Sequence, residues 1–227
     1  MWTSASAFVL FLAATHGLSG QEREFAAYNC AITPPDGWQK MTNMPPQPGL
    51  LAAFGKADKT ALLLIVVDDH NKTSGQMDDR FVSEFERGVE SSGVGKRVSG
   101  RFIEVAGIKS YERLGNFLVN GKHASIIMQA VPADGRLYSL QAMRFDGQAG
   151  ESPEIRRALA SFRFIRAPAV PNPTYSSDSA AYRTGYLMGR VAGVAVVIAG
   201  AITVVIALIR RRGKRTPATP PPLPPSG

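Results

Sequence analysis

Three adjacent residues have side chains that could bind a metal ion. Asp68, Asp69 and His70 directly follow a run of apolar residues, and Asp78 and Asp79 lie ten residues further on. Carboxylate oxygens together with an imidazole nitrogen can hold a hard divalent cation. The spacing matches no defined ligand loop, and both a strand end and a helix start favour acidic residues for structural reasons. We therefore expect a polar loop here and keep a metal-dependent hydrolase that uses this loop as the alternative.

Other catalytic patterns are absent from the sequence. It contains no G-x-S-x-G motif for a serine nucleophile. Gly88 and Gly93 have the spacing of P-loop glycines, but Val94 stands where a lysine is needed. The run 93–95 lacks the third glycine of a dinucleotide-binding fingerprint. We therefore expect a protein that is not an enzyme and that has no cofactor.

The residues around the Asp-Asp-His triplet predict the elements that position it. Residues 61–67 are apolar at every position, which is typical of a strand covered on both faces. Met77, Phe81, Phe85 and Val89 recur at four-residue steps and predict a helix. The triplet would then lie in the loop between this strand and this helix.

The second half of the domain predicts an antiparallel meander followed by a helix. Asn120-Gly121 and Asp134-Gly135 are two-residue hairpin signals between apolar runs. Ser152-Pro153-Glu154 resembles a helix start, with a capping serine and a proline at the first helical position. Residues 162–165 are expected to form a last short strand. Cys30, the only cysteine, excludes an intrachain disulfide, and we expect it to be a buried apolar side chain.

Most of the net positive charge lies near the C-terminus. The chain has 227 residues with 26 Lys+Arg, 18 Asp+Glu and a formal net charge of +8. Residues 21–170 contribute 19 of the basic residues and 17 acids, so this part is only +2. Electrostatic binding of nucleic acid needs a clustered basic patch on the folded body. We therefore expect no nucleic-acid partner.

Two apolar segments frame the chain and predict its topology. Residues 1–20 have the length of a signal peptide. Residues 191–209 contain no charge over 19 positions, and as a helix they would span about 28 Å, close to the ~30 Å hydrocarbon core. Five basic residues directly follow: Arg210, Arg211, Arg212, Lys214 and Arg215. The positive-inside rule then predicts a single-pass protein of the cytoplasmic membrane, with a cytoplasmic C-terminus and an extracytoplasmic domain.

The regions flanking the predicted span suggest contacts with partners. Gly185, Gly189 and Gly193 are spaced four residues apart, a pattern that lets helices approach closely and could join two copies of the chain. Within the tail, residues 220–225 should form a polyproline II segment, which could dock on an aromatic groove or act as a spacer. The prolines of this segment are Pro220, Pro221, Pro222, Pro224 and Pro225.

The order of elements resembles the PsbP/DcrB-like fold. The resemblance rests on residues 34–38 (Pro-Pro-Asp-Gly-Trp), the apolar strand 62–67, the helix 77–89, the meander, and the closing helix that runs into residues 161–164. It implies an α+β fold, an α/β/α-type sandwich with a central antiparallel sheet and two main helices. Members of this family are mostly noncatalytic binding or assembly factors, so the resemblance supplies no active-site residues. A C-terminal membrane helix would replace their lipid anchor or free form.

The expected organisation has five parts. These are a signal peptide (1–20), an extracytoplasmic domain (21–166), a linker with a juxtamembrane segment (167–186), a transmembrane helix (187–209) and a basic, proline-rich tail (210–227). The expected function is a membrane-anchored, noncatalytic binding or assembly module of the cell envelope. Its expected partners are the lipid bilayer, an envelope protein and a second copy of the chain through the transmembrane helix. A transmembrane sensor or scaffold that acts through the tail is a further alternative.

Overall fold

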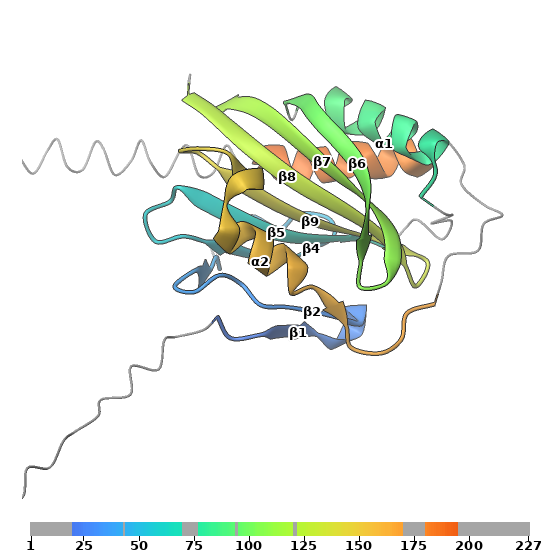
Figure 1. The fold of residues 1–227 in the computed structure, drawn as a ribbon, viewed down its shortest axis with the longest axis horizontal. Coiled ribbons are helices and arrows are strands. Elements are labelled where there is room, and N and C mark those ends of the chain that lie inside the picture. The colour runs from blue at the N-terminus through green and yellow to red at the C-terminus, as the bar shows by residue number, and fades with distance from the viewer. Residues whose placement is uncertain are drawn as a thin grey trace, which may run out of the picture.

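The computed structural model describes residues 20–42, 44–69, 77–93, 95–119, 122–169 and 180–194 (Figure 1). The strands are β1 (Arg23–Phe25), β2 (Cys30–Ile32), β3 (Gln39–Lys40), β4 (Leu50–Gly55), β5 (Ala61–Asp68), β6 (Lys96–Val105), β7 (Ile108–Val119), β8 (Lys122–Ala133), β9 (Arg136–Arg144) and β10 (Arg163–Phe164). The labelled helices are α1 (Asp79–Ser91) and α2 (Pro153–Ala160). Residues 180–194 form a further helix, called here the C-terminal helix.

The larger sheet is antiparallel and has the strand order β3-β4-β5-β9-β8-β7-β6. The β6–β7 and β8–β9 hairpins have two-residue turns: Val105 pairs with Ile108, and Ala133 pairs with Arg136. Both central residues of the second turn, Asp134 and Gly135, have positive φ, as a type I′ turn requires. Residues 120 and 121 lie outside the described residues, but the strands on either side pair at the two-residue spacing that the sequence predicts. The predicted meander is confirmed.

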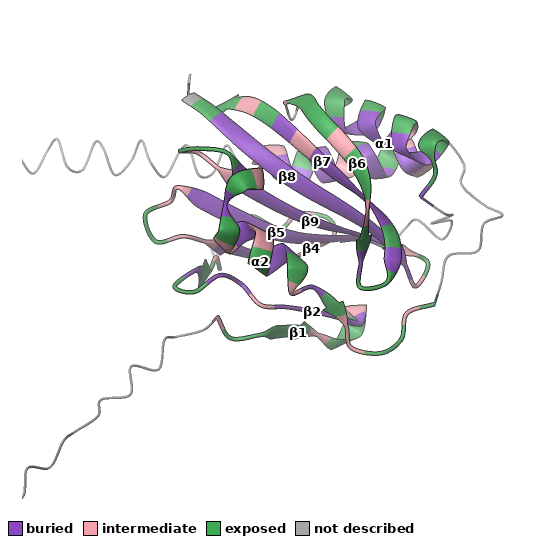
Figure 2. Cartoon of the chain, viewed as in Figure 1, coloured by how far each residue is buried: buried purple, intermediate pink, exposed green. Residues whose placement is uncertain are grey.

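Both faces of this sheet are covered, as Figures 1 and 2 show. On one face, Leu63, Ile65 and Val67 of β5 pack in a cluster with residues of α2 and of the small β1-β2-β10 sheet. On the other face, Leu62, Leu64 and Val66 pack in a cluster with residues of α1 and the C-terminal helix. Every residue of β5 is buried, which confirms the expected central strand. The architecture is an α+β sandwich around a large antiparallel sheet.

The two labelled helices begin with capping residues whose side chains bind free backbone N–H groups of the first turn. Asp78 caps α1, and its Oδ1 accepts a hydrogen bond from the backbone N–H of Phe81 at 2.7 Å. Ser152 caps α2, with Pro153 in the first turn, as the sequence predicts. The helix α1 begins two residues later than the expected start at Met77.

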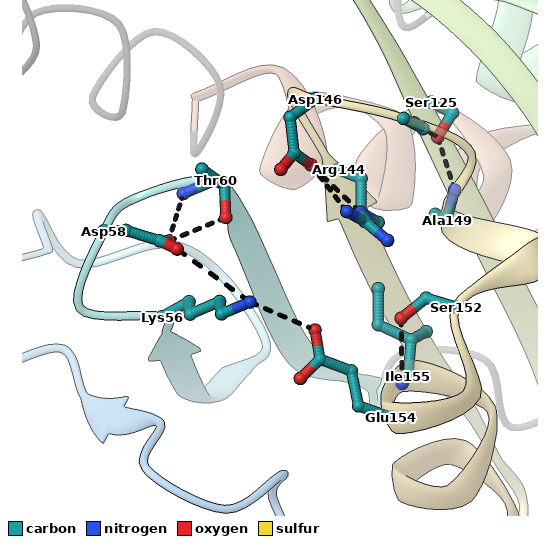
Figure 3. A network of polar contacts seen from close by, with 11 residues as sticks. Lys56, Asp58, Thr60, Ser125, Arg144, Asp146, Ala149, Ser152, Glu154 and Ile155 are labelled. Atoms are coloured by element: carbon teal, nitrogen blue, oxygen red, sulfur yellow. Dashed lines mark hydrogen bonds and ion pairs between the residues drawn. The ribbon is translucent and has the colours of Figure 1, made fainter.

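A polar network joins the start of α2 to the sheet (Figure 3). Lys56 Nζ lies 3.5 Å from Glu154 Oε1, and Ser125 Oγ accepts from the N–H of Ala149 at 2.6 Å. The Lys56–Glu154 pair is partly exposed and contributes little to stability. The bond at Ser125 is buried and satisfies a backbone group at the turn that leads into α2.

The C-terminal helix differs from the expected division of the chain. Residues 180–186 of the expected linker and residues 187–194 of the expected membrane span form this helix, and its buried face packs against the sheet. Met188, Val191 and Ala192 are fully buried. Gln141 Nε2 donates to the carbonyl of Met188 at 3.2 Å, and this bond ties the helix to β9. Residues of the C-terminal helix thus belong to the same core cluster as α1 and β5.

Several expected segments lie partly or wholly outside the described residues. The part of the chain that it describes contains no helix that is both long enough and apolar enough to cross a membrane. Residues 195–209 of the expected span lie outside that part, and so do residues 1–19 of the expected signal peptide and the tail from 210 onward.

Glycines bring the C-terminal helix close to α1. A Cβ atom at Gly185 would overlap the backbone of Phe85, and one at Gly88 would overlap the backbone of Tyr182. A Cβ at Gly189 would collide with the side chain of Ser92. The structure thus uses Gly185 and Gly189 for a contact between two helices of one chain. Association of two copies through these glycines remains a prediction.

We expect that Gly185→Val separates the two helices and destabilises the protein. The new side chain has no space against Phe85, and overpacking of this kind costs about 1–3 kcal/mol of unfolding free energy. Urea unfolding of the whole chain in detergent micelles measures this loss. Tyr186→Val is the matched control, because it places the same residue one position along the helix, where the native side chain is exposed. Equal losses for the two variants would contradict the close contact.

Candidate functional site

An open groove of about 1270 Å³ lies at the end of the sheet where β6 and β8 begin and β7 ends. The end of α1 and the loop after it supply Glu90 and Gly93 to its lining. Its remaining lining residues are Gly95, Lys96, Arg97 and Val98 from the start of β6, Asn116, Phe117, Leu118 and His123 from the hairpin, and Gly193 from the C-terminal helix. The groove therefore brings together three segments that are far apart in the sequence.

The groove combines apolar side chains with basic ones. Val98 and Leu118 are 61% and 64% exposed, which is unusual for large hydrophobic residues. Lys96 and Arg97 are basic, and among the described lining residues Glu90 is the one carboxylate. A surface of this composition suits an amphiphile with an apolar part and an anionic group.

Two glycines and a bulge shape the groove. Gly93 and Gly95 have φ angles of +80° and +62°, so they turn the chain sharply between α1 and β6. A Cβ at Gly95 would collide with the backbone of Asn116. The pairing of β6 with β7 shifts register between Arg97 and Ser99, and Val98 lies in this irregularity.

A buried ionic cluster lies between α1 and β7, next to the groove. Arg113 is fully buried, and its Nε donates to Glu86 Oε2 at 2.8 Å. The hydroxyl of Tyr111 donates to Glu86 Oε1 at 2.6 Å. Arg113 Nη2 donates to the carbonyl of Gly95, a groove residue, at 3.3 Å. The cluster therefore connects α1, the middle of β7 and the wall of the groove.

The charged side chains of this cluster lie close together. Arg97 Nε lies 3.7 Å from Glu86 Oε1, so two guanidinium groups face one carboxylate. Burial and the hydrogen bond to Glu86 raise the pKa of Tyr111 well above its ordinary value near 10, so this hydroxyl stays protonated and donates. A Cβ at Gly115 would collide with Arg113 Nη1, which is buried without a hydrogen-bond partner.

A second buried carboxylate lies on the opposite face of β7. Glu112 accepts hydrogen bonds from Arg101 Nη2 at 2.9 Å, Gln129 Nε2 at 2.9 Å and Arg156 Nη1 at 2.6 Å. Burial raises the pKa of Glu112, but the bond from Gln129 and the charges and bonds of the two arginines outweigh it, so the pKa lies below its ordinary value. Arg156 belongs to α2, so this carboxylate fixes α2 on the sheet.

The residues that the sequence suggested as metal ligands have separate partners. Asp68 is buried, and its Oδ2 accepts from the hydroxyl of Thr184 on the C-terminal helix at 2.5 Å. Asp69 Oδ1 lies 2.6 Å from Arg136 Nε, and His70 lies outside the described residues. In the part of the chain that the structure describes, no three His, Cys, Asp or Glu side chains gather as metal ligands would.

The other suggested residues are distributed as follows. Gly193 lines the groove, whereas Gly185 and Gly189 face α1. Cys30 is buried, as expected, and burial raises the pKa of its thiol to about 11. The five basic residues from Arg210 to Arg215 and the prolines from Pro220 to Pro225 lie outside the described residues.

The sequence reading did not identify the groove or the buried ionic cluster. One signal for the cluster was present: Glu86 lies four residues after Val82 and next to Phe85, within the apolar stripe of the predicted helix. A carboxylate in that stripe needs a buried partner. The groove depends on the juxtaposition of distant segments, for which a single sequence contains no signal.

Comparison with known proteins supports the fold and nothing finer. No protein-family model matches the sequence, and no curated protein matches it. The solution structure of cyanobacterial PsbP (CyanoP) from Synechocystis matches with a TM-score of 0.50 at 12% identity, over 70% of this chain and 98% of that one. This similarity confirms that the fold is PsbP-like.

Two further solved structures match less well. LpqN, described as involved in cell envelope biogenesis of Mycobacterium tuberculosis, has a TM-score of 0.41 at 13% identity, over 65% of this chain and 86% of that chain. A crystal structure from Bacteroides thetaiotaomicron has a TM-score of 0.47 at 11% identity, over 65% of this chain. The match covers 49% of the Bacteroides chain, so this chain spans about half of its length.

We expect that Arg113→Met strongly destabilises the protein, because it removes the buried partner of Glu86 and leaves this buried carboxylate with only the more distant, partly exposed Arg97. Removing one partner of a buried pair costs about 3–5 kcal/mol. The double variant Glu86→Gln/Arg113→Met should be less destabilised than the single one, since it removes the poorly compensated charge and leaves an acceptor for Tyr111. Denaturant unfolding measures both. A double variant as unstable as the single one would show that packing, and not charge, dominates at this position.

The low pKa of Glu112 predicts an acid-dependent loss of stability. Because the folded-state pKa is below the ordinary value of 4.5, the stabilisation is complete above that pH and is lost as the pH falls through the folded value. Glu112→Gln should therefore lower stability at pH 7 by about 1.5–3 kcal/mol and should flatten the decline below pH 4.5. Thermal unfolding across pH tests this, with Glu104→Gln at an exposed position as the control. An unchanged acid profile in Glu112→Gln would contradict the assignment.

Proposed function

We propose that this protein is a noncatalytic binding module of the cell envelope, anchored to the cytoplasmic membrane by its C-terminal apolar segment. The observation that carries the proposal is the docking of the C-terminal helix on the sheet. Residue 194, the last described residue of this helix, is followed directly by the uncharged run 195–209 and then by five basic residues. The domain and the apolar segment are therefore adjacent in the sequence, with no polar linker between them.

Two further points support this function. The PsbP-like fold confirmed by the similarity to CyanoP is the fold that the sequence resemblance associates with noncatalytic binding or assembly factors. The groove presents apolar and basic side chains for binding, whereas the carboxylates of the described region that were considered for catalysis have structural partners.

We expect the whole chain to remain in the membrane fraction after extraction with alkaline carbonate. The double variant Val197→Glu/Val204→Glu should be released, because carboxylates at the centre of a span are costly in hydrocarbon. The control is Thr216→Glu, which adds a carboxylate outside the run. Immunoblots of pellet and supernatant give the answer. Release of the unmodified protein would refute the anchor.

Topology can be tested with the same expressed chain. In spheroplasts, a membrane-impermeant maleimide should label Ala106→Cys on the domain and should leave Ser226→Cys in the tail unlabelled until the membrane is permeabilised. The native Cys30 is buried and gives little background. The reverse labelling pattern would refute the proposed orientation.

A further inference from the structure

We infer that the groove end of the domain rests on the membrane surface and binds the headgroups of anionic phospholipids. This inference rests on the proposed function and adds to it which face meets the bilayer and which lipids that face recognises. Three observations lead to it: the length of the remaining apolar run, the position of the groove and the composition of its rim.

The first observation is that the apolar run left after the docked helix is too short to span the hydrocarbon core. The expected span of residues 187–209 overlaps the C-terminal helix, and positions 187–194 are packed on the domain. This leaves the fifteen residues 195–209, which as a helix would extend about 22 Å. The hydrocarbon core is about 30 Å thick. A short span is accommodated when the flanking protein sinks into the interface or the bilayer becomes thinner. The domain must therefore lie close against the membrane for as long as the helix remains docked.

The second observation is the position of the groove. Gly193, in the last turn of the described helix, lines the same groove as Leu118 and His123 of the β7–β8 hairpin. In Figure 1 the C-terminal helix, in orange, ends on the side of the molecule where this hairpin ends. The groove is therefore on the side of the domain where the described part of the C-terminal helix ends, and the apolar run 195–209 follows directly in the sequence.

The third observation is the chemistry of that end. Val98 and Leu118 expose large apolar surfaces that suit the boundary between headgroups and acyl chains. Lys96 and Arg97 line the groove, and the exposed Arg190 lies one turn before Gly193. Phosphate groups pair with such side chains, and each basic residue near an anionic surface adds to its attraction. The occupant to which this surface is complementary is an anionic phospholipid bilayer.

The ionic cluster behind the groove gives this surface a rigid support. Arg113 bonds both to Glu86 on α1 and to the carbonyl of Gly95 at the start of β6. The guanidinium of Arg97 lies near the same carboxylate and 6.0 Å from the centre of the Tyr111 ring. The basic side chain in the groove is therefore held in place before a headgroup arrives.

The test measures the depth of single spin labels on the whole chain. The protein carries Cys30→Ala and either Leu118→Cys or Ala106→Cys, and it is reconstituted into vesicles of equal parts phosphatidylcholine and phosphatidylglycerol. The Ala106 turn is the matched control, because it closes the other end of the β6–β7 hairpin, about 30 Å away. We expect the Leu118 label to lie about 5–10 Å into the interface, shielded from an aqueous nickel chelate, and the Ala106 label to be fully accessible.

The charge dependence is tested with Lys96→Gln in the Leu118-labelled chain. The ratio of shielded to accessible label should fall about fivefold in the phosphatidylglycerol vesicles, as expected for the loss of one basic residue near an anionic surface. Lys109→Gln, near the far turn, is the control and should leave the ratio unchanged. In pure phosphatidylcholine the unmodified chain should dock less.

Each contrary result has a separate meaning. A chain that resists carbonate extraction but has a Leu118 label as accessible as the Ala106 label overturns this inference and leaves the proposed function intact. Such a result also fits undocking of residues 187–194 or a partner protein at the groove. Equal shielding in both kinds of vesicle overturns the assignment to anionic headgroups. A chain that carbonate releases overturns the proposed function itself.

Discussion

The central strand β5 is apolar on both faces, and the rest of the structure follows from the need to cover both of them. The residues of β5 alternate between two clusters, so neither face of that strand can remain in water. One cover comes from α2 and the small sheet. The other requires both α1 and the C-terminal helix, since Met188, Val191 and Ala192 pack in the same cluster as Phe81 and Phe85. The last described residues of the chain are thus part of the core.

This constraint also explains the charged groups on β7. Tyr111, Glu112 and Arg113 are consecutive residues of one strand, so their side chains alternate between the two covered faces. Each charge is buried, and each has a partner on the helix that covers its face: Glu86 on α1 for Arg113 and Arg156 on α2 for Glu112. Such pairs add little net stability relative to apolar residues, but a wrong helix position leaves a buried charge unpaired. The two carboxylates therefore favour one placement of each helix over others.

The sequence predicted the elements that depend on local chemistry. Residues such as Asp134-Gly135 and Ser152-Pro153 impose their own turn or helix start, and the apolar run of β5 indicates a strand covered on both sides. The membrane span expected from residue 187 begins within the C-terminal helix, because an apolar helix that packs on a sheet and one that enters a membrane have similar local patterns. The contacts that dock the helix, such as the close approach at Gly88 and Gly185, are tertiary and have no local signal in the sequence. The groove was not predicted at all, because Val98 and Leu118 belong to different strands and have no common signal in the sequence.

As we propose, the C-terminal helix belongs both to the core of the domain and to the membrane anchor. Its docking therefore links the stability of the domain to the fit of the apolar run in the bilayer. While it is docked, its buried face contributes to the stability of the domain, and the apolar run beyond it is too short to match the bilayer. Undocking would relieve the mismatch, but it would expose the apolar face of the sheet and leave the carboxylate of Asp68 without the hydroxyl of Thr184. Lowering the domain onto the headgroups relieves the same mismatch without exposing the core. The exposed apolar residues and the basic residues at that end of the domain are the side chains that such a position requires.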